Sequence, residues 1–386
     1  MSTKGTARLV ALGLVVMSLT GCLQADVRYL ASDNLAGRNN NTPGGIAARN
    51  WLVEQLRPMT VGPIPGAVGV DAYQQPFDKG VNVLGVIHGA VRPDEYVMIG
   101  AHYDHHGSCG SIDGDSICNG ATDNATGASL VLEMARRFAA NPPARSVVFA
   151  LWDAEEDGLL GSRYYVDHPV IPLEQTVTYL NLDIAGANLG PSLRTTTFAV
   201  GAESGGEALV DVVDRSFAAS SLNGQQLSAV FGLYRSDYAP FLGKQVPTVF
   251  FTDSTGPCYH TPKDDELAVD WAKLDQQADI LWRTATELAT STGVSTPMIT
   301  PEWENPPLTT HADAVELQTV IDRSMPDWGR YPPSMVADIG PHLANLDRMV
   351  TEGAGAYDAA DQSQLLAAAS ALVSMMTYGD CDPFLE

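Results

Sequence analysis

Short apolar runs alternate with stretches of helical periodicity through the first two-thirds of the chain. Runs of apolar and β-branched residues without helical spacing predict buried strands. These are expected at 81–88, 96–102, 146–152, 177–184, 195–200 and 246–251. Apolar positions at helical spacing predict helices at 26–31, 46–56, 124–139, 158–166, 205–219 and 271–288. This alternation predicts an α/β fold with a mostly parallel central sheet flanked by helices.

The C-terminal part of the chain has a different pattern. Residues 296–311 are rich in proline and threonine, which predicts a linker. Helices are predicted beyond it at 312–325, 334–350 and 361–376, and the last carries one apolar stripe. We expect a helical segment over 312–386 that packs on the α/β domain. A lid or an oligomerisation element is the alternative.

The N-terminus has the features of an export signal. Lys4 and Arg8 are followed by a short apolar run at 9–19 and then by Leu19-Thr20-Gly21-Cys22. This order is typical of a secretory signal peptide. A cysteine directly after Leu-Thr-Gly resembles the bacterial lipobox and predicts cleavage before Cys22 and its acylation. An ordinary signal peptide with an incidental cysteine is the alternative.

The predicted order of segments is therefore a signal peptide at 1–21, an α/β domain at 22–295, a linker and a helical C-terminal segment. The mature protein is expected to be exported and lipid-anchored to a bacterial membrane, with the outer membrane favoured, or secreted if Cys22 is not acylated.

Charge and cysteine content narrow the choice of partners. The chain has 46 Asp and Glu against 22 Lys and Arg, a net charge of −24, which argues against a nucleic-acid partner. Export would permit disulfides. Cys109 and Cys118 flank a loop rich in Gly, Asp and Ser, and we expect them to pair. Cys258 and Cys381 are candidates for a second pair, although sequence spacing does not determine connectivity.

Histidines and carboxylates recur at the predicted strand ends and in the loops that follow. They are His102, Asp123, Glu155, Glu156, Asp183 and His260. Ligand sites of open α/β sheets collect beyond the carboxyl ends of the strands. Zinc binds imidazole nitrogen and carboxylate oxygen. Two histidines and three carboxylates suit a two-metal site, and one further carboxylate remains to act as a base.

Each of these residues also has an ordinary structural interpretation. Asp123 could cap the helix that begins near 124. Glu155 and Glu156 could be a solvated pair, but they closely follow a buried apolar strand, where adjacent carboxylates are costly without a cation. Asp104, two residues after His102, can orient its imidazole. The residues favour a metal site more strongly together than singly.

Taken in order, the motifs resemble those of the M28 zinc peptidases, in the secreted aminopeptidase-like branch, over about 26–288. The segments that carry the resemblance are Tyr29-Leu30-Ala31-Ser32-Asp33-Asn34-Leu35-Ala36-Gly37-Arg38, Ala101-His102-Tyr103-Asp104, Gly120-Ala121-Thr122-Asp123-Asn124-Ala125-Thr126-Gly127, Asp153-Ala154-Glu155-Glu156-Asp157-Gly158-Leu159-Leu160-Gly161-Ser162, Asn181-Leu182-Asp183, Ser236-Asp237-Tyr238 and Tyr259-His260-Thr261-Pro262.

The resemblance implies a zinc-exopeptidase fold and a peptidase with two zinc ions that removes N-terminal residues from peptides. One zinc would bind His102 and Asp183, and the other Glu156 and His260. Asp123 would bridge both ions. The resemblance also implies a cis peptide bond after this bridging aspartate.

The resemblance further assigns the catalytic roles. Glu155 would be the general base, Tyr259 would help to polarise the scissile carbonyl, and Asp104 would support His102. The chain departs from the family at Tyr238, where many relatives have histidine. The loop at 107–119 is a local elaboration.

Other readings of these residues remain. His105 and His106 are expected to be loop or supporting residues. A cluster of arginines near the site, for which Arg163 and Arg235 are candidates, would suggest a carboxypeptidase instead. Ser204 stands in the context of a serine nucleophile, but its motif has Ala202 in place of glycine and no convincing acid–histidine pair follows.

Two functions of other classes are also considered. A glutaminyl-cyclase-like acyltransferase would share the fold and typically bind one zinc. A non-catalytic binding lipoprotein would show gaps among the ligands, and none is missing here.

Overall fold

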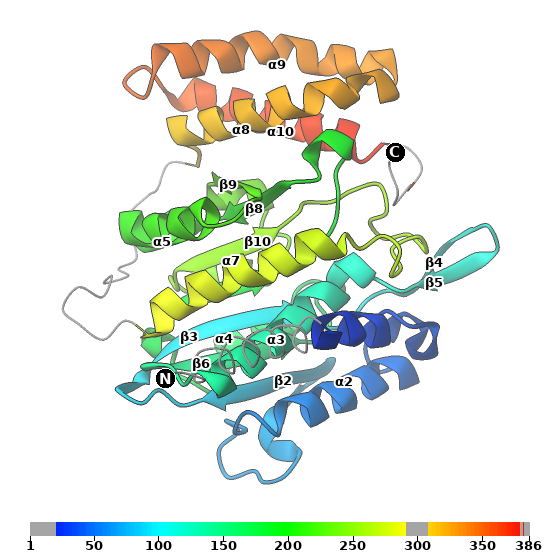
Figure 1. The fold of residues 1–386 in the computed structure, drawn as a ribbon, viewed down its shortest axis with the longest axis vertical. Coiled ribbons are helices and arrows are strands. Elements are labelled where there is room, and N and C mark those ends of the chain that lie inside the picture. The colour runs from blue at the N-terminus through cyan, green and yellow to red at the C-terminus, as the bar shows by residue number, and fades with distance from the viewer. Residues whose placement is uncertain (1–20, 291–307, 379–380, 382–386) are drawn as a thin grey trace, which may run out of the picture.

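The computed structural model describes residues 21–290, 308–378 and 381. An eight-stranded sheet, in the order β1-β2-β6-β3-β7-β10-β8-β9, forms the centre, and β4 and β5 form a separate hairpin (Figure 1). The strands are β1 (Gln74–Phe77), β2 (Gly80–Ile87), β3 (Arg92–His102), β4 (Gly107–Ile112), β5 (Asp115–Cys118), β6 (Arg145–Trp152), β7 (Thr176–Leu182), β8 (Thr196–Val200), β9 (Asn223–Leu227) and β10 (Thr248–Thr252).

Helices cover both faces of this sheet. Residues 21–30 form the first described helix. The others are α2 (Pro43–Leu56), α3 (Thr126–Ala140), α4 (Leu160–Asp167), α5 (Gly206–Ala218), α6 (Tyr238–Gly243), α7 (Trp271–Thr290), α8 (His311–Ser324), α9 (Pro333–Glu352) and α10 (Ala359–Met376).

The predicted α/β class and the mostly parallel sheet are confirmed. Strands β6, β3, β7 and β10 run parallel to one another, and β2 and β8 join this group in antiparallel orientation. Every predicted strand and helix is present, with ends shifted by a few residues. The sequence pattern missed α6, the hairpin, and the edge strands β1 and β9. The hairpin and the edge strands are short and mostly polar, and α6 has only six residues, too few to show helical spacing.

Each face of the sheet has its own hydrophobic core. Along β6, Val147 and Phe149 belong to the core that residues of α2, α3, α5 and α7 share, whereas Val148 and Trp152 belong to the core that residues of α4, α6 and the C-terminal helices share. All eight residues of β6 are buried because helices cover both of its faces. The strand therefore forms a rigid support for the loop that follows it.

The C-terminal helices α8, α9 and α10 pack on the α/β domain, as expected, beyond its β8–β9 edge (Figure 1). Buried Asp313, in the first turn of α8, accepts hydrogen bonds from the amide and hydroxyl of Ser228, both at 2.7 Å. Buried Asp327, which follows α8, accepts a hydrogen bond from the amide of Ser192 at 2.9 Å. Polar contacts thus fix this segment at two separate points.

Two disulfides are present in the described residues, one local and one between distant parts of the chain. Cys109 pairs with Cys118 across the β4–β5 hairpin, and Cys258 pairs with Cys381. Both expected pairings are therefore present. The second joins the end of the chain to the loop after β10, a loop that also carries one of the predicted metal ligands.

The predicted segment boundaries remain predictions. Most of the proposed linker and nearly all of the proposed signal peptide lie outside the described residues. Among the residues that the structure describes, none of the helices combines the length and the apolar composition that crossing a bilayer requires.

Asp313→Ala is expected to destabilise the protein. It leaves the buried amide of Ser228 without its acceptor, at a cost of about 1–3 kcal/mol in the free energy of unfolding. Urea unfolding followed by circular dichroism would measure this as a lower midpoint. Asp322→Ala, an exposed position on the same helix, should change the free energy by less than about 0.5 kcal/mol. Equal midpoints for both variants would show that the Asp313 contact does not stabilise the docking.

Candidate metal centre

Three adjacent parallel strands bring most of the predicted ligands to one edge of the sheet. His102 is the last residue of β3 and lies opposite Trp152, the last residue of β6. Asp183 directly follows β7, which flanks β3 on its other side. Glu155 lies in the turn after β6. Parallel strands end at the same edge, so these side chains converge although they are far apart in sequence.

A first group forms around His102, which is 1% exposed. Its Nε2 lies 3.2 Å from Oδ1 of Asp123 and 3.3 Å from Oδ1 of Asp183. The second oxygen of Asp183 accepts a hydrogen bond from the hydroxyl of Ser236 at 2.7 Å, which fixes the orientation of the carboxylate. This group contains the histidine and both carboxylates expected at one metal.

A second group lies on the other side of Asp123. Nε2 of His260 is 3.1 Å from Oδ2 of Asp123 and 3.3 Å from Oε2 of Glu156. Asp123 therefore presents one oxygen to His102 and the other to His260. This is the arrangement expected of a carboxylate that bridges two metals.

The loop before α3 holds Asp123 in place. The peptide bond between Asp123 and Asn124 is cis, as the resemblance implied. The side-chain amide of Asn124 donates to the main-chain carbonyl of Leu182 at 2.8 Å and ties the loop to the end of β7. Gly127 must be glycine here, because a Cβ would lie 2.0 Å from Oδ1 of Asn124.

Asp264 supports the same loop. It was not among the residues predicted from the sequence. Its carboxylate is buried and accepts hydrogen bonds from the amide of Thr122 at 2.9 Å, from the hydroxyl of Thr122 at 2.8 Å and from the amide of Asp123 at 3.1 Å. Its position four residues after His260 was the available signal in the sequence.

Arg38 is a second supporting residue that the sequence analysis did not single out, although it ends the lead-in motif. Its guanidinium is fully buried and donates to the carbonyls of Tyr103 at 2.8 Å, Leu30 at 3.1 Å and Gly120 at 2.7 Å, and to that of Asn119. These carbonyls belong to the first helix and to the loops that carry His102 and Asp123. Arg38 therefore joins these three segments at one buried positive charge.

Asp104 approaches His102 through both its main chain and its carboxylate. Nδ1 of His102 lies 3.1 Å from the main-chain carbonyl of Asp104, whereas the carboxylate is 3.7 Å away. That carboxylate instead accepts hydrogen bonds from the amides of Glu155 at 3.0 Å and Glu156 at 3.3 Å. Asp104 thus supports both the histidine and the two glutamates, but through different atoms.

His105 and His106 lie closer to the site than loop residues would. His105 is fully buried, and its Nδ1 is 2.5 Å from Oε1 of Glu156. Nε2 of His106 lies 3.1 Å from Oε2 of Glu156 and 3.1 Å from Nδ1 of His260. Both imidazoles therefore surround the Glu156–His260 group, as supporting residues would.

Burial and charge shift the acidities of the clustered carboxyl groups. Burial raises the pKa of Asp104 to about 8 and that of Glu155 well above its usual value, despite the opposing effect of His102. Burial would also raise the pKa of Asp123, but the imidazoles of His102 and His260 beside its two oxygens outweigh this effect and hold the pKa well below its usual value. Carboxylates crowded in this way require compensating positive charge.

The side-chain nitrogen and oxygen atoms of this cluster are suited to binding metal ions. Nε2 of His260, Oε1 of Glu156 and both ring nitrogens of His105 are buried and make no hydrogen bond within the described residues. Three of these atoms nevertheless lie 2.5–3.3 Å from other polar atoms, namely Nε2 of His260, Oε1 of Glu156 and Nδ1 of His105. Such close approach without donor–acceptor alignment is expected where atoms face a shared cation. Imidazole and carboxylate donors are those that zinc prefers.

A cavity of about 200 Å³ opens beside this group. Asp123, Glu155, Glu156, Asp183 and Tyr259 all line it. Oε2 of Glu155 lies 3.9 Å from Nε2 of His102, and this is the one ion pair that the carboxylate makes within the described residues. Its carboxylate therefore remains available at the cavity wall.

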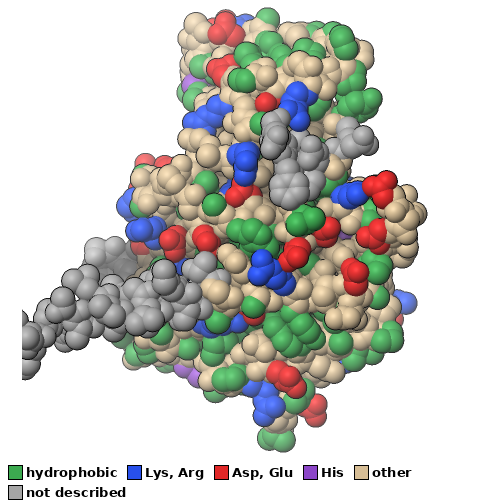
Figure 2. All heavy atoms as spheres, turned by 45° about the vertical axis from the view of Figure 1, so that its right-hand side comes forward, with side chains coloured by type: hydrophobic (Ala, Val, Ile, Leu, Met, Phe, Trp, Pro, Cys, Tyr) green, Lys and Arg blue, Asp and Glu red, His purple; other side chains and the backbone are tan. Residues whose placement is uncertain are grey.

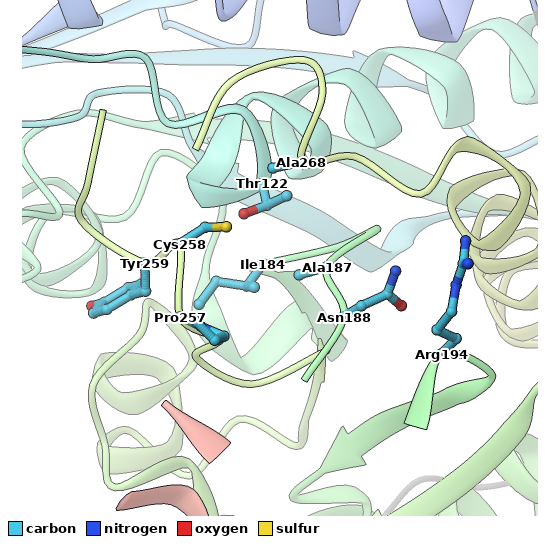
Figure 3. Close-up of a pocket in the computed structure, with 10 residues that line it drawn as sticks. Thr122, Ile184, Ala187, Asn188, Arg194, Pro257, Cys258, Tyr259 and Ala268 are labelled. Carbon is cyan, nitrogen blue, oxygen red and sulfur yellow. The ribbon is translucent and has the colours of Figure 1, made fainter. Parts of the chain in front are cut away.

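Figure 3 shows a second pocket, with Tyr259 and Arg194 at its opposite ends. Its volume of about 30 Å³ suits a water molecule and not a substrate residue. The larger cavity is therefore the candidate substrate site.

Several other residues have structural roles. Tyr238 is buried, and its hydroxyl donates to the carbonyl of Ala229 at 3.0 Å. Ser204 is buried and donates to the carbonyl of Gly201 at 2.7 Å, so it is not presented as a nucleophile. Asp253 follows β10 but pairs with buried Lys273 at 3.0 Å.

Arg235 lines the larger cavity.

The distribution of charged side chains on the face in Figure 2 indicates which kinds of partner could bind there. Among the described side chains there, acidic and basic residues are interspersed, and the basic ones do not gather into a single patch. This distribution agrees with the acidic composition and gives no support to nucleic-acid binding at this face.

Arg38→Met is expected to lower the free energy of unfolding by about 3 kcal/mol or more, because it leaves several buried carbonyls without donors. Calorimetry of the chelator-treated protein would measure the effect without a contribution from metal. Arg57→Met makes the same substitution at an exposed position and should have little effect. If the two variants melt together, Arg38 does not organise these loops.

Comparison with known proteins places this geometry in a family. Aminopeptidase NAALADL1 of Rattus norvegicus is 40% identical over 150 residues, which cover 37% of this chain and 19% of the relative. Aminopeptidase YwaD of Bacillus subtilis is 30% identical over 208 residues, which cover 52% of this chain and 43% of the relative. The chain thus spans less than half the length of these two curated relatives.

Solved structures show the same fold. The LapA aminopeptidase of Legionella pneumophila matches with a TM-score of 0.56 and 19% identity, over 71% of this chain and 73% of that one. A Zn-dependent exopeptidase from Parabacteroides distasonis matches with a TM-score of 0.55 and 18% identity, over 69% of this chain and 97% of that one.

The family model described as peptidase family M28 matches residues 82–285. This match includes both histidine–carboxylate groups and the bridging aspartate. Because it also spans more than half of the sequence, the chain belongs to peptidase family M28.

Proposed function

We propose that this protein is a two-zinc aminopeptidase that removes N-terminal residues from peptides. The observation that carries the proposal is the placement of Asp123, with one carboxylate oxygen toward His102 and the other toward His260. His102 and Asp183 would hold one zinc, Glu156 and His260 the other, and Asp123 both. Bound zinc would supply Lewis acidity, lowering the pKa of water and polarising a carbonyl.

The remaining groups would act on protons and charge. Glu155 would accept a proton from the attacking water and pass it to the leaving amine. Its position in the cavity wall places it beside both histidine–carboxylate groups. The hydroxyl of Tyr259 would donate to the oxyanion that develops on the substrate carbonyl. Asp104 would keep the turn that carries Glu155 in position through its hydrogen bonds to the two amides.

Zinc stoichiometry and substrate choice test this function together. We expect two zinc ions per chain by elemental analysis, and hydrolysis of aminoacyl 4-nitroanilides but not of peptides with blocked N-termini. One zinc with glutamine cyclisation would instead indicate the acyltransferase. The absence of both zinc and turnover would instead indicate a non-catalytic binding lipoprotein.

A carboxypeptidase is the second candidate, because Arg235 lines the cavity and could bind a terminal carboxylate. The Glutamate carboxypeptidase 2 homolog of Caenorhabditis elegans is 31% identical over 210 residues, which cover 47% of this chain and 26% of that protein. Release of C-terminal residues from N-blocked peptides would favour this function over the aminopeptidase.

Glu155→Ala is expected to reduce kcat by about a hundredfold or more, because it removes the proton acceptor, and to leave the zinc content unchanged. The matched variant Asp123→Ala should lose zinc as well as activity. Leucyl 4-nitroanilide hydrolysis and elemental analysis of dialysed protein measure both effects. Retained turnover in Glu155→Ala would refute its role as base, and full zinc content in Asp123→Ala would refute the bridge.

We also propose that Cys22 is the lipid attachment site of an exported protein. Cys22 is exposed, and the four other cysteines are paired, which suits an oxidising compartment. The full chain, expressed in a bacterial host with radiolabelled fatty acid, should incorporate label and fractionate with membranes. Cys22→Ser should lose the label. An unlabelled wild-type protein, or a labelled Cys22→Ser variant, would contradict the proposal.

A further inference from the structure

The cavity beside the candidate metal centre extends away from the carboxylates toward the C-terminal helices. Its far wall consists of Leu317 and Val320 from α8, and of Ala369, Leu372, Val373 and Met376 from α10. All of these residues lie beyond 285, where the match to the family model ends. The segment that the family resemblance does not explain therefore borders the candidate site directly.

The sheet supplies the opposite wall. Phe198 of β8 and Phe250 of β10 line the cavity from the face on which the C-terminal helices pack. The lining of this cavity is mostly apolar, and its charged residues are the carboxylates of the candidate metal centre and Arg235. A ligand that fits it must combine an apolar group with a reacting polar group beside Glu155.

The wall formed by the helices is held in place. Asp313 and Asp327 bind Ser228 and Ser192, as described above. The C-terminal segment also closely approaches the connection between β7 and β8 at Gly190, where a Cβ would lie 2.8 Å from Oδ2 of Asp327 and 3.0 Å from Cε of Met376. Such contacts give the cavity a defined shape, and a defined shape can discriminate between ligands.

The size of the cavity indicates the ligand. A protein cavity of about 150 Å³ accommodates benzene, so about 200 Å³ suits one aromatic or branched aliphatic side chain. We propose that α8 and α10 complete the pocket for the side chain of the substrate's N-terminal residue and select large apolar residues such as phenylalanine and leucine. This inference rests on the proposed aminopeptidase function.

Ala369→Phe tests the inference by filling the cavity from α10. Ala369 is partly buried and lines the cavity, whereas Ala367 is exposed on the same helix, so Ala367→Phe is the matched control. The value of kcat/KM for phenylalanyl 4-nitroanilide should fall about tenfold or more in Ala369→Phe, because side-chain pockets discriminate steeply by size. The value for alanyl 4-nitroanilide should change by less than about twofold. Ala367→Phe should change neither value.

The outcomes separate the two proposals. A wild-type protein that binds zinc but cleaves no aminoacyl amide contradicts the aminopeptidase function itself. A wild-type protein that cleaves alanyl faster than phenylalanyl substrate contradicts only the pocket assignment, as do equal losses on both substrates in Ala369→Phe. If Ala369→Phe melts at a lower temperature than the control, Val373→Phe repeats the test from a more exposed position on the same wall. Unchanged selectivity in that variant overturns the inference.

Discussion

The structure depends on the concentration of negative charge at one edge of a buried sheet. Glu155, Asp183 and Asp123 meet within a few ångströms of His102, and each is nearly inaccessible to water. Removing several carboxylates from water is tolerated only with compensating positive charge and hydrogen bonds. Histidines, amides and, in the function we propose, two zinc ions provide that compensation.

Much of the surrounding fold supports this charge cluster. Asp104 binds the amides of both glutamates, Asp264 binds the loop of Asp123, and Ser236 binds Asp183. Arg38 places one guanidinium beneath these loops and joins them to the N-terminal helix. Each supporting group satisfies backbone or side-chain donors and acceptors that a loop would otherwise bury without partners. Ligand positions are therefore defined by the loops as much as by the strands.

The C-terminal segment extends the site in a different way. Its described residues contribute no side chain to the histidine–carboxylate groups, but its helices form part of the cavity into which those groups open. Buried aspartates and a disulfide attach the segment to the domain at separate points. A chemical centre typical of a family is thus combined with a pocket wall that belongs to this chain. Substrate selection can change in such an arrangement without a change in the catalytic groups.

The sequence by itself determined the α/β class, the main strands and helices, and the residues that meet at the candidate centre. These features follow from local patterns: apolar runs, helical spacing, and histidines and carboxylates placed at strand ends. Only the tertiary structure decided the roles of Arg38 and Asp264, the atoms through which Asp104 acts, and the closeness of His105 and His106 to Glu156. It also decided that α8 and α10 border the cavity. The physical reason is that hydrogen bonds and cavity walls join residues distant in the chain, and periodicity carries no information about which distant surfaces will meet.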